Sequence, residues 1–264
     1  VGSSVKVKDA APAALAYDLD AVIKGQREVP RVILASVPGN LDQIRETDER
    51  KALFFKTVLP LVLKVNEQIV ADRERLWDLN AQKKAGMKVD AVDRLWLAVM
   101  AERYGTARGD VASLLRRHDV VPPSLALAQA ATESAWGTSR FVKEGNAIFG
   151  EWTFSEDHEG IVPNGRASGK THRIRAFDSL YDSVQSYVSN LNSHRAYKEF
   201  RSVRAELRAS GLPLDGMRLA STLYRYSERG AAYVDELHVL ISTNNLEYLD
   251  GARLSKTKTF EPVI

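Results

Sequence analysis

Apolar positions recur at helical spacing along most of the chain. Between Asp48 and Leu79 they return every three or four residues, which predicts a helix. Pro60 lies inside this stretch and predicts a kink or a division into two helices. Further helices are predicted over residues 12–25, 90–105, 110–119, 123–137, 179–211 with a break near Ser193, 215–228 and 231–244.

The pattern changes after Gly150. Residues 151–177 are rich in glycine, contain the turn pair Asn164-Gly165 and end in the alternating stretch THRIRAF. These features predict one or two β-hairpins. The order is therefore helices, a small β lobe at about 150–177, and helices again. A mainly α fold with a small β-hairpin lobe follows from that order.

Composition narrows the classes of function. The 264 residues carry 44% hydrophobic and 27% charged side chains, which is ordinary for a globular protein. A net charge of +3 without a basic stripe argues against a nucleic-acid partner. The absence of cysteine excludes disulfides and thiolate chemistry, and the five histidines form no metal-binding pair, so no metal or cofactor is expected.

No transmembrane segment is expected from the hydrophobic runs. The longest candidate, residues 52–65, is interrupted by Lys56, Pro60 and Lys64. It also falls short of the roughly 20 apolar residues that a spanning helix needs.

Glu133 is the residue that first suggests catalysis. On a helix over 123–137 it would share a face with Gln129, Ala130, Trp136 and Gly137. These mostly small groups would leave room for a ligand and would partly desolvate the carboxyl. Desolvation raises the pKa of a carboxylic acid, which can then donate a proton near neutral pH. The alternative is a structural glutamate paired with Arg140.

Four stretches together resemble a known family. ATESAWGTSRF is followed by NAIFGEW, and further on by HRIRAFDSLYDSVQSYVSNLNSHRAY and LYRYSERGAAYVDEL. This arrangement is similar to the bacterial N-acetylglucosaminidases of glycoside hydrolase family 73, in its Bax-like branch. The resemblance covers roughly Asp110 to Leu246.

The resemblance implies a lysozyme-like helical domain with a small β lobe and a glutamate general acid at Glu133. It also implies a tyrosine near the end of the cleft, whose phenol would hydrogen-bond the sugar or steady positive charge at the anomeric carbon. Tyr226 fits this position best, with Tyr224 and Tyr233 as alternatives because the spacing departs from the commoner form of the motif.

Hydrolysis through a pair of carboxylates needs a second acid. Some members of the family place one in the β lobe, where this chain has Glu151, Glu156, Asp157 and Glu159. Glu159 is the first choice and Glu156 the next. A solvated surface is the alternative for these acids, and the substrate's own 2-acetamido oxygen would then serve as nucleophile.

Other residues of the motifs are candidates for substrate contacts. Asn146 would serve the loop or the acetamido group, and Phe149 would form the floor beside the turn at Gly150. Trp136 and Trp152 could stack on sugar rings, and Trp152 is preferred.

The resulting expectation is an N-terminal helical extension over 1–105 and a lysozyme-like domain over 106–264. Its activity would be hydrolysis of the β-1,4 bond between N-acetylglucosamine and N-acetylmuramic acid in peptidoglycan glycan strands. It would act in the periplasm or cell envelope, and the extension would cover the cleft or bind an envelope protein. The rivals are a lytic transglycosylase, a non-catalytic glycan-binding module and a helical interaction protein.

Overall fold

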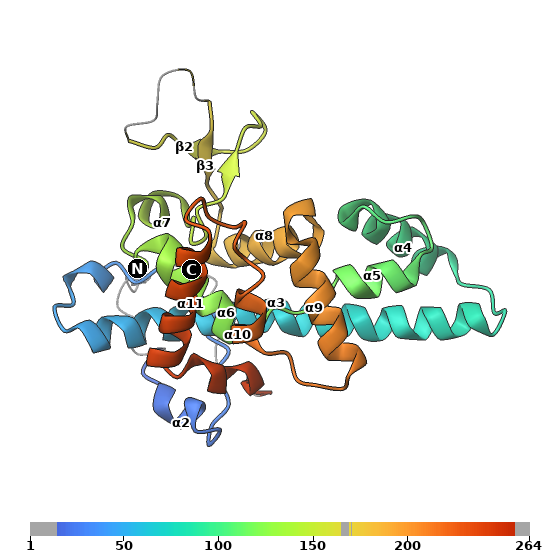
Figure 1. The fold of residues 1–264 in the computed structure, drawn as a ribbon, viewed down its shortest axis with the longest axis horizontal. Helices are drawn as coiled ribbons and strands as arrows, with labels where there is room; N and C mark the ends of the chain where they lie inside the picture. Colours follow the sequence, from blue (N-terminus) through green and yellow to red (C-terminus); the bar gives the residue numbers. More distant parts are fainter. Residues whose placement is uncertain (1–14, 165–168, 170, 257–264) are drawn as a thin grey trace, which may run out of the picture.

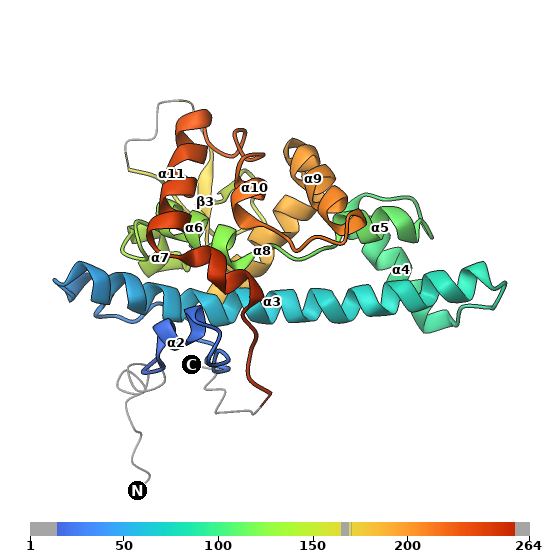
Figure 2. The ribbon, with the colours of Figure 1, turned by 60° about the horizontal axis from the view of Figure 1, so that its bottom comes forward.

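The fold is a cluster of helices mounted on one long helix, with a small sheet at one side (Figures 1 and 2). The structure, a computed structural model, describes residues 15–164, 169 and 171–256. Its α-helices are α2 Leu19–Ile23, α3 Thr47–Lys84, α4 Ala91–Tyr104, α5 Val111–Arg117, α6 Pro123–Ser134, α7 Arg140–Gly145, α8 Leu180–Ser193, α9 Lys198–Ala209, α10 Gly216–Ala220 and α11 Ala231–Thr243. Short 3-10 helices lie at Leu41–Gln43, Arg195–Tyr197 and Leu246–Gly251.

Helix α3 runs through Pro60 without dividing, so the predicted division into two helices is wrong. A proline inside a helix leaves the carbonyl four residues earlier without its usual donor. Here that carbonyl belongs to Lys56, and it accepts a hydrogen bond from the Tyr17 hydroxyl at 3.3 Å. Burial of Pro60 and its neighbours on both sides holds the helix in place despite the lost bond.

The other helix ends follow local sequence signals. Asp90 and Asp110 cap α4 and α5 by accepting from the backbone N–H groups of Asp93 and Ser113. Gly105 ends α4 in the left-handed conformation. The predicted break near Ser193 is confirmed. The predicted helix over 215–228 is too long, because α10 ends at Ala220 and turns follow.

The β lobe is a three-stranded antiparallel sheet of β1 Trp152–Thr153, β2 Gly160–Ile161 and β3 Arg173–Arg175. The strand order is β1-β3-β2, with Trp152 opposite Ile174 and Gly160 opposite Arg175. The predicted small β lobe is therefore confirmed, and its sheet stands away from the helices in Figure 1. The predicted turn pair ends in Gly165, which lies outside the described residues.

One buried cluster joins the N-terminal and C-terminal helices. It includes Val58 of α3, Leu125 of α6, Leu191 of α8 and Leu237 of α11, all fully buried. The fold is thus the expected mainly α, lysozyme-like one with a helical N-terminal region packed against it. The division at residue 105 stays a prediction of the sequence.

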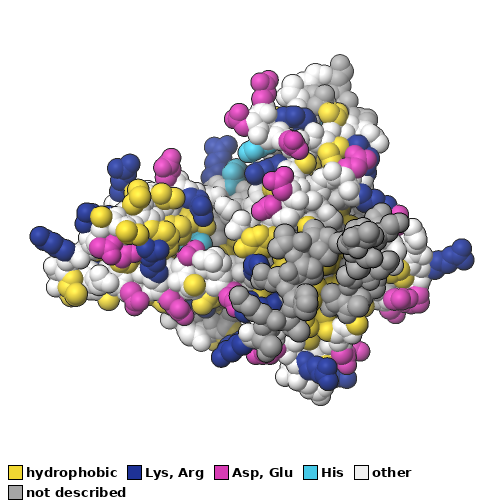
Figure 3. All heavy atoms as spheres, turned by 180° about the vertical axis from the view of Figure 1, so that it is seen from behind, with side chains coloured by type: hydrophobic (Ala, Val, Ile, Leu, Met, Phe, Trp, Pro, Cys, Tyr) yellow, Lys and Arg dark blue, Asp and Glu magenta, His cyan; other side chains and the backbone are white. Residues whose placement is uncertain are grey.

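Helix α4 presents an apolar stripe to solvent. Val92, Leu95 and Val99 are exposed and recur at the spacing of one helix face. Hydrophobic side chains gather over this end of the molecule in Figure 3. None of the helices in the described part of the chain is both long enough and apolar enough to cross a membrane.

Candidate active site

Helix α6 ends one residue after Glu133. Three successive residues, Ala135, Trp136 and Gly137, have positive φ angles of 50°, 59° and 75°. The predicted helix over 123–137 is therefore too long, and Trp136 and Gly137 do not share a helix face with Glu133. The Ser134 hydroxyl accepts from the Gly137 N–H at 2.8 Å and fixes this turn. Left-handed conformations cost energy outside glycine and cluster at functional sites.

A directed chain of hydrogen bonds leads to the Glu133 carboxyl. The Tyr187 hydroxyl donates to Gln129 Oε1 at 2.7 Å, and Gln129 Nε2 donates to the Tyr233 hydroxyl at 2.9 Å. Because Tyr233 accepts from Gln129, its own proton is left to donate to Glu133, to which it is hydrogen-bonded. Gln129, Tyr187 and Tyr233 are all fully buried, so the chain is shielded from water.

Burial raises the pKa of Glu133 above its ordinary value of 4.5. The hydrogen bond from Tyr233 and the charge of Arg229 act in the opposite direction, and the charge of Glu236 adds to the rise. Arg229 is engaged elsewhere, in an ion pair with Glu236 at 2.6 Å. The carboxyl also lies at the negative end of the α6 dipole, which disfavours its ionised form. Glu133 thus holds its proton more tightly than a solvent-exposed glutamate does.

Gly150 keeps the space beside this carboxyl open. Its φ of +59° favours glycine, and the only atom within 4 Å of an added Cβ would be Glu133 Oε2, at 3.9 Å. Any side chain at this position would lie over the acid. The glycine therefore places no side chain over the carboxyl.

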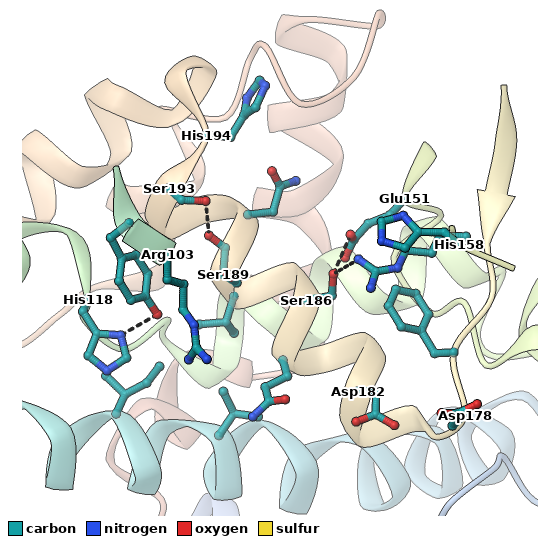
Figure 4. Close-up of a pocket in the computed structure, with 18 of the residues that line it drawn as sticks. Arg103, His118, Glu151, His158, Asp178, Asp182, Ser186, Ser189, Ser193 and His194 are labelled. Atoms are coloured by element: carbon teal, nitrogen blue, oxygen red, sulfur yellow. Dashed lines mark hydrogen bonds between the residues drawn. The ribbon is translucent and has the colours of Figure 1, made fainter. Parts of the chain in front are cut away.

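A polar groove of about 1170 Å³ begins at the β lobe and runs along α8 to α3, α4 and α5 (Figure 4). Trp152, Glu159 and Arg175 line its first part, and Asp72, Arg103 and His118 line its far end. Glu133 is not among the lining residues. It lies beside Gly150, whose chain neighbour Glu151 does line the groove. A second hollow of about 440 Å³ lies between the end of α6 and α11.

Tyr197 lines the groove and lies near Glu133. It is 8% exposed. Burial, followed by the charges of Glu151 and Glu133, raises its pKa to about 12. Both carboxyls therefore act on one phenol at the groove wall.

Glu151 is the acid of the β lobe that is held most firmly. Its Oε2 accepts from the Ser186 hydroxyl at 2.8 Å, while Oε1 is buried without a hydrogen-bond partner. Burial raises its pKa, against the opposing effects of Ser186 and Arg175. The sequence includes it among the candidate acids but gives no reason to prefer it, because Ser186 comes from a helix 35 residues later.

The other β-lobe candidates differ in position. Glu159 is exposed and lines the groove, whereas Glu156 is exposed and does not line it. Trp152 is 59% exposed at the groove, with one ring face stacked on His172 at 4.2 Å between centroids. Glu159 and Trp152 thus line the groove together with the candidate acids Glu151 and Asp157, and Glu156 does not.

The remaining motif residues serve packing or loop contacts. Asn146 donates from Nδ2 to the carbonyls of Phe177 and Asp178, which ties the end of α7 to the segment before α8. Phe149 is buried and stacks on Tyr187 at 3.8 Å between centroids, as a floor. Trp136 packs edge-on against Phe54 and Phe55 of α3.

The three candidate tyrosines occupy different places. Tyr233 touches Glu133, and Tyr226 stacks on Tyr233 with centroids 5.6 Å apart and rings 2° from parallel. Tyr226 is half-buried, and its other neighbour is Tyr197 at 5.8 Å. Tyr224 is exposed and donates to Glu199 at 3.1 Å. The sequence did not single out Tyr187, which lies 58 residues from its partner Gln129.

No cluster of three or more metal-ligating side chains occurs among the residues that the structure describes.

Comparisons with known proteins agree with these motifs. Residues 109–246 match the model of the glucosaminidase family, described as mannosyl-glycoprotein endo-beta-N-acetylglucosaminidase. The chain is 32% identical to protein bax of Escherichia coli (strain K12) over 201 residues, which cover 74% of this chain and 70% of that protein. No solved structure matches the chain.

The raised pKa of Glu133 predicts a pH-dependent cost in stability. The folded protein binds this proton more tightly than the unfolded chain, so the free energy of unfolding falls as the pH rises from the ordinary carboxyl pKa through the raised one. We expect Glu133→Gln, which cannot ionise, to be more stable than the parent at neutral pH and equal to it in acid. Denaturant unfolding across this pH range measures the difference.

Glu228→Gln is the matched control, because Glu228 is an exposed acid in the turns that follow α10. It should follow the parent at every pH. A constant difference between Glu133→Gln and the parent across the whole range would contradict the assignment.

Proposed function

The chain belongs to the glucosaminidase family, and on that premise we propose that it hydrolyses the β-1,4 bond between N-acetylglucosamine and N-acetylmuramic acid in peptidoglycan. Glu133 is the general acid that protonates the leaving oxygen. The observation that carries this proposal is a half-buried carboxyl with a raised pKa, held by Tyr233 beside the open space at Gly150. Since this polymer is built outside the cytoplasmic membrane, the site of action is the periplasm or cell envelope.

The groove is the binding site for the glycan strand. The sugar chain occupies its β-lobe end, and the volume of about 1170 Å³ leaves room beyond a single sugar. Trp152 offers an exposed ring at the β-lobe end for stacking on a sugar, and the serines of α8 offer hydroxyl groups. A glycan that enters at this end passes Gly150 and brings a glycosidic oxygen to Glu133.

Tyr226 supports the transition state in this proposal. Positive charge develops on the sugar ring as the glycosidic bond breaks. Tyr226 stacks on Tyr233 and lies at a tilt against Tyr197, and all three phenols lie close to Glu133. Their electron-rich faces and hydroxyl oxygens can stabilise that charge.

Loss of the Glu133 carboxyl should stop turnover and leave binding intact. A general acid contributes about 10²- to 10⁴-fold to a rate. We therefore expect Glu133→Gln to lose hydrolysis of purified peptidoglycan by that order, while it sediments with the insoluble polymer as the parent does. Product mass spectra should show N-acetylglucosamine at the new reducing ends.

Other outcomes of this experiment favour the rivals. Ends of 1,6-anhydro-N-acetylmuramic acid would indicate a lytic transglycosylase. Equal behaviour of parent and variant in both assays would indicate a binding module without turnover, and no affinity for the polymer would indicate an interaction protein.

Removal of the Tyr233 hydroxyl should move the pH profile. The hydrogen bond from Tyr233 lowers the pKa of Glu133 against the larger effect of burial. Without it the pKa rises further, so the protonated acid persists to higher pH. We expect Tyr233→Phe to shift the alkaline limb of the kcat/KM profile to higher pH. Tyr226→Phe should lower kcat and leave the pH of that limb unchanged. A profile for Tyr233→Phe that overlays the parent's would contradict this role.

Glu159 is the proposed base that activates water. Its side chain is exposed and lines the groove, where it can meet both water and the sugar chain. Glu151 is less suited, because burial favours its neutral form. We expect Glu159→Gln to lower kcat about 100-fold or more. Glu156→Gln is the matched control in the same loop and should stay near the parent.

Full turnover of Glu159→Gln would contradict this assignment. The 2-acetamido oxygen of the substrate would then be the nucleophile, as substrate-assisted hydrolysis requires only one protein acid.

An envelope protein as partner of the N-terminal region stays a prediction. The apolar stripe of Val92, Leu95 and Val99 on α4 is the surface at which we would seek it.

A further inference from the structure

The groove extends beyond what a general acid and its sugar require. Its far end lies between α3, α4 and α8, and Arg103 points into it from the last turn of α4 (Figure 4). This end is built by the N-terminal helical region, while the sugar-binding end is built by the β lobe. The N-terminal region therefore supplies one wall of the same groove.

A buried chain of side chains fixes Arg103. Its guanidinium is hydrogen-bonded to the Tyr104 hydroxyl, which bonds His118 Nδ1 at 2.6 Å. His118 Nε2 in turn bonds Asp72 at 3.0 Å, and Gln68 donates to the same carboxylate at 3.1 Å. Tyr104 and His118 are 4% and 3% exposed. Both ring nitrogens of His118 are therefore engaged, and the residue holds Tyr104, the partner of Arg103, in position.

Arg103 keeps binding capacity on its exposed side. A guanidinium has five N–H donors, and the Tyr104 hydroxyl occupies only part of them. Within the described ranges no carboxylate forms an ion pair with it, although its charge acts on Asp72, which is hydrogen-bonded to Gln68 and His118. A held arginine with open donors is well suited to a carboxylate.

Helix α8 provides a polar path between the two ends. Ser186, Ser189 and Ser193 all line the groove and are spaced as one helix face. Seven residues of helix span about 10 Å. An extended peptide covers roughly 3.3 Å per residue, so about three residues bridge this path.

We propose that the far end of the groove binds the acidic peptide branch of the glycan, with Arg103 as the contact for one of its carboxylates. This inference rests on the proposed function, because it takes the polymer of that proposal as ligand. The sugar chain lies at the β lobe, and its peptide follows the serines of α8 toward α4. The enzyme then prefers glycan that still carries peptides.

Arg103→Gln tests the site with two polymers, intact peptidoglycan and the same glycan after an amidase has removed its peptides. An exposed ion pair contributes up to about 1 kcal/mol, so we expect kcat/KM on the intact polymer to fall about two- to fivefold. The rate on stripped glycan should equal the parent's. Arg94→Gln is the matched control, since Arg94 is another exposed arginine of α4 and does not line the groove.

Two results would overturn the proposal. An equal loss of kcat/KM on both polymers would show that Arg103 acts without the peptide. No loss of kcat/KM on either polymer would show that no carboxylate of the peptide binds Arg103. If the parent cleaves neither polymer, the proposed function fails, and the inference is then decided by binding. Soluble peptide-bearing glycan fragments should bind Arg103→Gln more weakly than the parent, and peptide-free fragments should bind both alike.

Discussion

The hydrogen bond between Tyr233 and Glu133 is the interaction on which the site depends. Burial raises the pKa of the carboxyl, because an ionised acid with fewer water contacts is costly. One phenol donor offsets part of that cost and fixes the direction of the carboxyl. The donor is itself oriented by Gln129, which is oriented by Tyr187. A chain of neutral groups therefore leads to the proton on Glu133, and Arg229, whose charge also acts on the acid, is ion-paired with Glu236.

The turn after α6 completes this arrangement. Two non-glycine residues, Ala135 and Trp136, adopt positive φ, and their strain is balanced by the packing of Trp136 on Phe54 and Phe55. The reversal ends the helix directly behind Glu133. Gly150 then approaches the carboxyl from another segment and places no side chain over it. Packing that looks purely structural thus sets the exposure of the acid.

Helix α3 links the two halves of the chain. Its middle lies in the common core, and its residues Gln68 and Asp72 belong to the groove and to the network that holds Arg103. The N-terminal region is therefore part of the binding surface as well as of the core. The proposed binding of a sugar chain and its peptide branch in one groove depends on this shared wall.

The sequence by itself determined what is local. Helical periodicity, the caps at Asp90 and Asp110, the small β lobe and the glutamate beside Gln129 all follow from nearby residues. It erred at the end of α6, because the reversal after Ser134 requires contacts with α3. Only the tertiary structure decided that Tyr233 meets Glu133, and that Tyr187, Tyr104 and Asp72 orient their partners. Such pairs are 40 or more residues apart in most cases, and a hydrogen bond between distant segments leaves no periodic pattern in the chain.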